Sequence, residues 1–241
     1  YKLLIVRIIP HLIFQSCLKF TKDDVTMKNQ KGFTLVEMAI VLVIIGLLLG
    51  GVLKGQELIE NSKIKNAIND IKGVQGAFNG YIDRFRQMPG DDGPVDDLKA
   101  RKGSWADITV GGDRDGVLDI TAAQTFTGAA DEGVGFWQHL KAAGFISGSS
   151  KDAGVQAYPR NAFGGLTAAT GNAVTGMPTN SKYVCLGSVP GKGARAIDVS
   201  LDDGIPNKGV MMATQASNNG EPGDAATVYE DDQTYTICVN M

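Results

Sequence analysis

The chain has 241 residues, 43% of them hydrophobic and 20% charged, which is the composition of a folded protein of one or two domains. Its net charge of −3 gives no electrostatic support for nucleic-acid binding. Two histidines and three cysteines are too few for a conventional zinc site unless carboxylates fill in. Composition thus excludes several classes of protein but identifies none.

Residues 1–26 lack an initiator Met, and their short apolar run is interrupted by Arg7, Pro10 and His11. A run of about twelve residues is too short to span a bilayer. We interpret this segment as sequence upstream of a start at Met27, and the alternative is a genuinely long leader. In both cases we expect residues 1–32, and Cys17 with them, to be absent from the mature protein.

Residues 33–53 form an apolar run with a single charge, Glu37. A run of about twenty apolar residues is long enough to cross a bilayer as a helix. Lys28 and Lys31 precede it, and the positive-inside rule places that end in the cytoplasm and the bulk of the chain outside. No small-x-small cleavage site follows Leu53, so we expect the apolar segment to be retained.

A carboxylate inside a membrane span costs on the order of 2.5–3.5 kcal/mol and therefore needs a partner. A cut between Gly32 and Phe33 would create an α-amino group about one helical turn from Glu37. The amino terminus of a neighbouring subunit could reach the same carboxylate. Either pairing would neutralise both charges in an apolar environment.

The run Lys31-Gly32-Phe33-Thr34-Leu35-Val36-Glu37, followed by an unbroken apolar helix, resembles the class III signal of type IV pilins and type II secretion pseudopilins. The resemblance implies that prepilin peptidase cuts between Gly32 and Phe33 and methylates the amino group of Phe33. It implies that Glu37 promotes subunit docking. Further implied partners are other pilin or pseudopilin subunits, an inner-membrane platform protein and an assembly ATPase.

Beyond Leu53 the helical period continues, but only one face remains apolar. Apolar residues recur at spacings of three and four up to Phe85, and Pro89-Gly90 ends the pattern. We therefore predict an amphipathic helix over residues 54–88 that packs on a soluble head. A coiled coil is the alternative for this stripe.

Residues 89–241 alternate short β-prone segments with turns rich in Gly, Asp and Asn. A short helix is predicted at 131–143. The strand candidates are 182–188, 194–201, 209–213 and 227–240, with Asp202-Asp203-Gly204 as a turn between two of them. The predicted fold class is α+β: a long N-terminal helix, half transmembrane and half amphipathic, packed on a C-terminal antiparallel sheet head, as in pilins.

Cys185 and Cys238 are the only cysteines that remain after the predicted processing. A head outside the cytoplasm lies in an oxidising compartment, where such a pair tends to form a disulfide. The bond would tie the last strand to the sheet, as a C-terminal disulfide does in many pilins. The alternative is two separate buried thiols.

Asp113, Asp115 and Asp119 alternate around Gly116, a pattern that can wrap a calcium ion. The match to an EF-hand loop is incomplete, and a plain Asp-Gly turn is the favoured interpretation. No other cofactor is predicted. A second acidic group, at positions 91, 92, 96 and 97, is predicted to be a solvated loop.

No motif of nucleophilic, metalloprotease or phosphate-binding chemistry is present, so we predict a structural protein rather than an enzyme. His139 is expected to be a surface or packing residue, and Trp105, Phe136 and Trp137 to be core residues rather than a carbohydrate-binding patch. Without residues 1–32 the chain has 17 basic and 24 acidic residues, a net charge of −7 that argues against nucleic-acid binding.

The function predicted from the resemblance is a structural subunit of a type IV pilus or a type II secretion pseudopilus. We expect a single-pass inner-membrane protein with a periplasmic head, which is later extracted into a periplasmic or extracellular filament. The alternative is a single-span membrane-anchored binding protein that does not polymerise.

Overall fold

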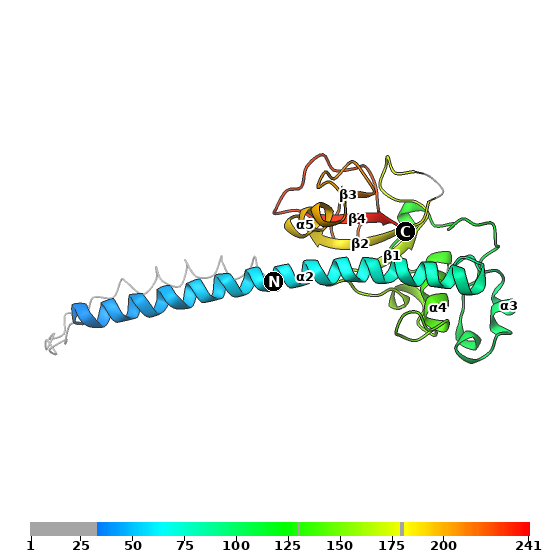
Figure 1. Ribbon diagram of the computed structural model, residues 1–241, viewed down its shortest axis with the longest axis horizontal. Coiled ribbons are helices and arrows are strands. Elements are labelled where there is room, and N and C mark those ends of the chain that lie inside the picture. Colours follow the sequence, from blue (N-terminus) through cyan, green and yellow to red (C-terminus); the bar gives the residue numbers. More distant parts are fainter. Residues whose placement is uncertain (1–32, 130, 179–180) are drawn as a thin grey trace, which may run out of the picture. The chain divides into compact units, whose positions relative to one another are not determined.

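The computed structural model describes residues 33–129, 131–178 and 181–241. The chain is α+β and pilin-like, as the sequence predicts: a long apolar N-terminal helix precedes shorter helices and a four-stranded antiparallel sheet (Figure 1). The leader predicted at 1–32 lies outside the described residues. The helices are α2 (Leu35–Phe85), α3 (Val95–Lys99), α4 (Glu132–Ala142) and α5 (Gly191–Leu201), with short 3-10 helices at Gly103–Asp107, Ala122–Gln124 and Gly154–Ala157.

Contacts between Cα atoms divide the chain into two compact units. Residues 33–51, the described part of the first unit, contain no buried side chain. The second unit, Val52–Met241, contains the rest of α2 and the whole head. Most of the apolar half of α2 thus belongs to the first unit and its amphipathic half to the second, and each unit is considered by itself below.

The amphipathic half of α2 packs on the head through the stripe that the sequence predicts. Its buried side chains follow helical spacing: Ala67, Ile71, Val74, Ala77, Phe78 and Tyr81. The stripe is therefore a core face and not a coiled-coil seam. The helix ends before the predicted position 88, because Arg86 adopts a left-handed conformation with a φ of 57°.

The sheet is antiparallel, with the order β1-β2-β4-β3. In the register of the central pair, Cys185 of β2 lies opposite Cys238 of β4. The Nε2 of Gln75 on α2 donates a hydrogen bond to the carbonyl of Asn240, with the two atoms 2.7 Å apart, and so ties the helix to the end of β4. The strands are β1 (Thr167–Thr170), β2 (Tyr183–Pro190), β3 (Met211–Gln215) and β4 (Thr234–Asn240).

Two features of the predicted sheet are wrong. The strand predicted at 194–201 is helix α5, which buries Ala194 and Ile197 at helical spacing and follows Pro190 as its N-cap residue. The turn Asp202-Asp203-Gly204 consequently joins α5 to β3 rather than one strand to another. Strand β1 is not among the sequence candidates, because two of its four residues are alanines, which favour strands weakly.

Gly187 lies within β2, although a glycine in this sequence context is typical of a turn. A bulge interrupts the pairing of β2 with β4 between Leu186 and Val189. A Cβ at Gly187 would lie 2.6 Å from the Oδ1 of Asn219, so the close approach of that loop requires a glycine here.

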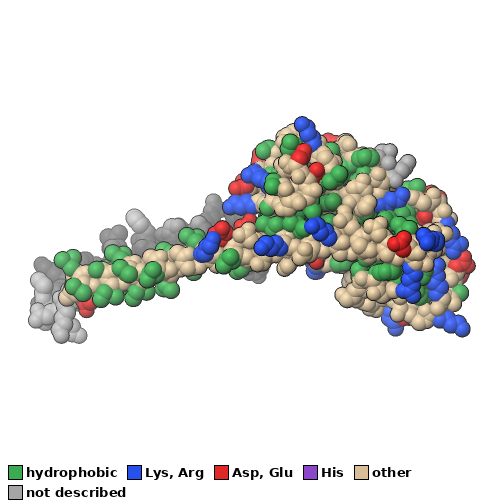
Figure 2. Space-filling view, in the orientation of Figure 1, with side chains coloured by type: hydrophobic (Ala, Val, Ile, Leu, Met, Phe, Trp, Pro, Cys, Tyr) green, Lys and Arg blue, Asp and Glu red, His purple; other side chains and the backbone are tan. Residues whose placement is uncertain are grey.

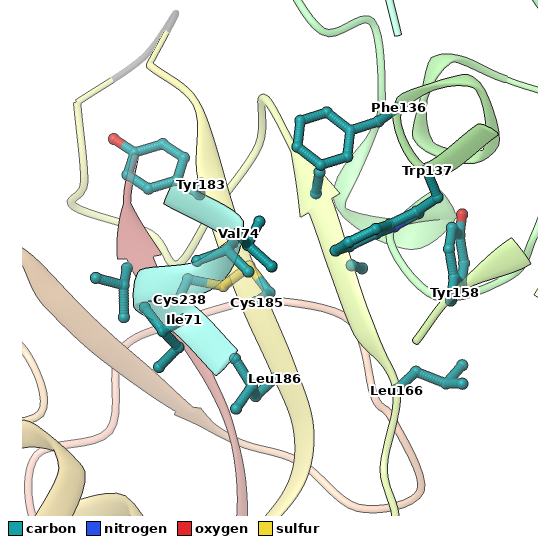
Figure 3. Close-up of a cluster of buried hydrophobic side chains, with 14 of the residues drawn as sticks. Ile71, Val74, Phe136, Trp137, Tyr158, Leu166, Tyr183, Cys185, Leu186 and Cys238 are labelled. Atoms are coloured by element: carbon teal, nitrogen blue, oxygen red, sulfur yellow. A yellow bond between two sulfur atoms is a disulfide. The ribbon is translucent and has the colours of Figure 1, made fainter. Parts of the chain in front are cut away.

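The core of the head joins the helix to the sheet through one cluster of buried side chains, part of which is drawn in Figure 3. Cys185 and Cys238 are buried in this cluster and form the disulfide that the sequence predicts. They are 53 residues apart, and closing a loop of that length constrains the unfolded chain and so stabilises the fold. Ile71 and Val74 of α2 belong to the same cluster, so the disulfide lies where helix and sheet meet.

Candidate processing and assembly site

Helix α2 begins with a reciprocal pair of hydrogen bonds between Thr34 and Glu37. The backbone N–H and the hydroxyl of Thr34 both donate to Oε2 of Glu37, at 2.8 and 2.9 Å. The backbone N–H of Glu37 donates in return to Oγ1 of Thr34 at 3.2 Å. This is a capping box, which satisfies donors that the first turn of a helix leaves without partners. It places the Glu37 carboxylate at the positive end of the helix dipole.

Both bonds from Thr34 end on Oε2 of Glu37, and Oε1 accepts no hydrogen bond from any described residue. The carboxylate therefore keeps one oxygen that can accept from an outside donor. Phe33 precedes the capping box and is 82% exposed, so the residue on the carboxyl side of the predicted cleavage is accessible. Gly32, on the other side of that bond, lies outside the described residues.

Every large apolar side chain from Leu35 to Leu53 is at least 46% exposed. Figure 2 shows green side chains over much of the outer part of the α2 stem, with tan atoms between them. Within the described residues, α2 is the one helix long and apolar enough to cross a membrane. An apolar surface of this extent in water marks a segment that lipid or another protein covers.

Of the three predicted calcium ligands, the structure brings two together. Carboxylate oxygens of Asp113 and Asp115 lie within 4.8 Å of one another and of Asp91, whereas Asp119 is not part of this group. Asp91 and Asp92 are buried, so the prediction of a solvated loop is wrong for both, although Asp96 and Asp97 are exposed.

The contacts of Asp91 explain its burial without an ion. Its Oδ1 accepts from the backbone N–H groups of Asp113 and Arg114, and its Oδ2 accepts from that of Gly116 at 2.8 Å. These three bonds from a loop more than twenty residues away hold the loop in place. A calcium ion takes six to eight oxygens, so the three carboxylates would need backbone or water oxygens to complete its shell.

Asp92 lies beside Asp91 but accepts hydrogen bonds from different residues. Arg101 donates to both of its carboxylate oxygens, at 2.7 and 3.0 Å, and the Tyr81 hydroxyl donates to Oδ2. The Arg101 guanidinium also lies 4.6 Å from the centre of the Trp105 ring. This buried network fixes the loop after α2 against the helix, which is a structural role.

Glu132, at the start of α4, is a further carboxylate near this loop that sequence reasoning missed. Its Oε2 accepts from the backbone N–H of Asp119 at 2.7 Å. Burial raises the pKa of Glu132 to about 7, and the charges of Asp91, Asp119 and Asp113 raise it too, against the lowering effect of that hydrogen bond. An excess of negative charge therefore accumulates between α4 and the 113–116 loop.

Sequence reasoning also missed a cluster of three aspartates at the end of α5. Carboxylate oxygens of Asp198, Asp202 and Asp203 lie within 4.8 Å of one another. Asp198 is buried and accepts from the Tyr229 hydroxyl at 2.7 Å, and burial raises its pKa. Asp202 accepts from the backbone N–H of Met211 at 2.9 Å. The adjacent aspartates before Gly204 were the available signal, but the wrong strand at 194–201 concealed their proximity to Asp198.

His139 is a core residue, which settles the choice between surface and packing. Its Nδ1 accepts from the backbone N–H of Gly90 and its Nε2–H donates to the carbonyl of Val110, both at 3.0 Å. Burial lowers its pKa to about 4. Trp105, Phe136 and Trp137 are buried as predicted and do not form an exposed carbohydrate-binding patch.

Comparison with known proteins bears on the N-terminal segment. The chain matches the family model described as the prokaryotic N-terminal methylation motif at residues 27–53. No curated protein matches the chain. The matched residues contain Gly32, Phe33 and Glu37 and the apolar start of α2. The chain therefore carries the class III signal of type IV pilins and pseudopilins and begins as a pilin-like precursor.

Proposed function

We propose that this chain is a structural subunit of a type IV pilus or a type II secretion pseudopilus. The observation that carries the proposal is the methylation motif at 27–53, whose helical part leaves its apolar side chains exposed and contains one charge, Glu37. The α+β head packed on the amphipathic half of α2 agrees with it. The protein acts by assembly and not by catalysis.

Prepilin peptidase cuts the precursor between Gly32 and Phe33 and methylates the new amino terminus. The test is the intact mass and the N-terminal peptide of the protein isolated from membranes of cells with an active peptidase. We expect a chain that begins at N-methylated Phe33. A chain that still carries residues 27–32 would overturn the proposal.

Residues 33–53 hold the subunit in the inner membrane before assembly. Residues 54–88 connect this span to the head, residues 89–241, on the periplasmic side, because Lys28 and Lys31 keep the preceding segment in the cytoplasm. The platform protein and the assembly ATPase then extract the subunit into a filament of identical or of different pilin subunits. No nucleic-acid partner is proposed.

Glu37 guides docking of the subunit. Its Oε1, which accepts no hydrogen bond from the part of the chain that the structure describes, is suited to accept from the α-amino group of a neighbouring copy's Phe33, which would neutralise both charges in the apolar filament core. Meanwhile Oε2 stays bonded to Thr34 and fixes the direction of the carboxylate.

The rival function is a membrane-anchored binding protein that never polymerises. Glu37→Ala separates the two: an assembling subunit should lose incorporation into filaments, whereas a passive anchor should insert equally well or better. Glu57→Ala is the matched control, since this exposed carboxylate pairs with Lys54 outside the apolar run. Equal membrane insertion of both variants, with neither variant nor the unsubstituted chain recovered in filaments, would favour the passive anchor.

Pilus and pseudopilus are separated by the phenotype of cells without this chain. Loss of surface filaments identifies a pilus subunit, and loss of secreted proteins from the medium identifies a pseudopilin. Re-expression of the chain from a plasmid should restore whichever property is lost.

A further inference from the structure

An open cavity lies beside the first turn of α4, within the unit Val52–Met241. Its volume is about 390 Å³, which falls in the range of small-molecule sites, about 300–1,000 Å³. The apolar side chains of Pro94, Val95 and Val110 form part of its lining. The same lining contains two carboxylates, Glu132 and Asp113. The cavity therefore combines an aliphatic surface with two negative charges.

Glu132 is the buried carboxylate of this cavity, since only 9% of the residue is exposed. Its Oε2 accepts the backbone N–H of Asp119, whereas its Oε1 accepts no hydrogen bond from the described residues. A Cβ built on Gly112, which also lines the cavity, would lie 2.8 Å from this Oε1. None of the ion pairs between described residues includes Glu132. A buried charge without a cation is costly, so this oxygen lacks the partner that it needs.

The charges around Glu132 are mostly negative. The carboxylates close enough to act on it are those of Asp91, Asp113 and Asp119. The guanidinium of Arg114, on the same loop, pairs with Asp97 instead, at 3.3 Å. The amino terminus of α4 contributes the equivalent of about half a positive charge. Four carboxylates outweigh that contribution, so the cavity attracts a cation.

The arrangement at Glu132 suits an organic cation better than a metal ion. Calcium takes six to eight oxygens and magnesium six. Among the residues that the structure describes, the carboxylates that converge within 4.8 Å at this loop are those of Asp91, Asp113 and Asp115, and Glu132 is not in that group. A single carboxylate oxygen next to aliphatic side chains matches an ammonium group on a carbon chain, because the ammonium donates and the chain packs.

The second carboxylate of the lining, Asp113, selects among such ligands. Asp113 is exposed, whereas Glu132 is buried. A molecule that satisfies both carries two ammonium groups joined by an aliphatic chain. We propose that the cavity binds an aliphatic diamine, with one ammonium group on Oε1 of Glu132 and the other beside Asp113. The inference goes beyond the proposed function and does not depend on assembly, because it assigns a small-molecule ligand to the head.

Calorimetric titration of the full chain in detergent at pH 8 with 1,5-diaminopentane tests the proposal. We expect one site per chain, and roughly tenfold weaker binding by Glu132→Gln, which loses a charge-assisted hydrogen bond but keeps an acceptor for the Asp119 N–H. Asp115→Asn is the matched control, because Asp115 carries the same charge but does not line the cavity. Absence of binding, or equal losses in the two variants, would overturn the inference.

The monoamine 1-aminopentane has the same carbon chain and tests the contact with Asp113. We expect the unsubstituted chain to bind it roughly tenfold more weakly than the diamine, and Asp113→Asn to remove this difference. Because Asp113 is exposed, its substitution leaves the buried contacts of the head in place. Equal affinities of the unsubstituted chain for the two amines would overturn the diamine in favour of a single ammonium group, such as a lysine side chain of a partner protein.

Calcium chloride in place of the diamine separates an organic ligand from a metal ion. Binding of calcium but not of the diamine, with loss of calcium in Asp115→Asn, would overturn the inference and assign a cation site to Asp91, Asp113 and Asp115. Each of these outcomes leaves the methylation of Phe33 and filament assembly untouched, so the proposed function is tested separately.

Discussion

The two ring nitrogens of His139 are bonded to backbone groups, which fixes the neutral tautomer protonated at Nε2. Protonation of Nδ1 would break its bond from the Gly90 N–H inside the core. The pKa of His139 in the folded chain is accordingly lowered from 6.5 to about 4 by burial. His139 therefore contributes its full stabilisation above its unfolded pKa of 6.5, where it is neutral in both states. That contribution is lost as the pH falls from 6.5 toward the folded pKa of about 4, because the unfolded chain then takes up a proton that the folded chain does not.

We therefore expect the unfolding free energy of the full chain in detergent to fall between pH 6.5 and pH 4, and His139→Gln to flatten this decline. At pH 7.5 the variant should be less stable by about 1–3 kcal/mol, because it cannot satisfy both backbone partners in the same geometry. Denaturant titrations at several pH values measure both effects. A decline of unchanged steepness in the variant would assign the acid sensitivity to other groups.

Glu132 should have the opposite pH dependence. Its folded pKa, about 7, lies above the ordinary value of 4.5, so its contribution to stability is full below pH 4.5 and is lost as pH rises through 7. Glu132→Gln keeps an acceptor for the Asp119 N–H and removes the charge. We expect the variant to match the parent at pH 4.5 and to be more stable at pH 8. A variant that is less stable at pH 8 would show that the ionised carboxylate has a stabilising partner.

At the scale of an element, the 113–116 loop depends on one carboxylate that precedes it in the chain. Asp91→Ala would leave three backbone N–H groups without their acceptor, so we expect a loss of about 3 kcal/mol. Asp119→Ala, a nearby exposed aspartate outside the group, is the control and should change stability little. Thermal unfolding of the full chain in detergent measures both.

The same measurement distinguishes a hydrogen-bonded turn from a calcium site. Since backbone N–H groups already bond to Asp91, we expect a chelator to leave the unfolding temperature unchanged. A rise on adding calcium that Asp113→Ala abolishes would instead establish a cation site, because a ligand that binds only the folded state stabilises it.

The elements that sequence predicted best are those with a strong period or composition. Residues 54–88 display a helical stripe, and the predicted strands at 182–188 and 209–213 overlap β2 and β3. Ile197 and Val199 favoured a strand where α5 forms, because the choice depends on burial against three strands of the sheet that local sequence does not reveal. Asp91 looked solvated for the same reason, because the loop that donates to it lies more than twenty residues away, and Asp92 looked solvated because its bonds to Tyr81 and Arg101 form only in the folded chain.

At the scale of the whole molecule, the two units of the chain differ in where their apolar side chains lie: exposed in the first unit and largely buried in the second. Every buried side chain among the described residues lies at or after Ala67. The disulfide and the aromatic and ionic contacts of the head also lie within the second unit. Residues 33–53 thus add nothing to the described core, and the buried contacts of the described fold lie in Val52–Met241.

A chain that begins at Lys54 should therefore fold in plain buffer with its disulfide formed. We expect its unfolding free energy to agree with that of the full chain in detergent to within about 0.5 kcal/mol, because truncation removes no buried contact. Trp105 and Trp137 are both buried in the head, so their fluorescence follows the same transition in the two proteins. A deficit of 2 kcal/mol or more would mean that the apolar half of α2 contributes to the fold of the head, and that its exposed side chains serve more than membrane insertion and assembly.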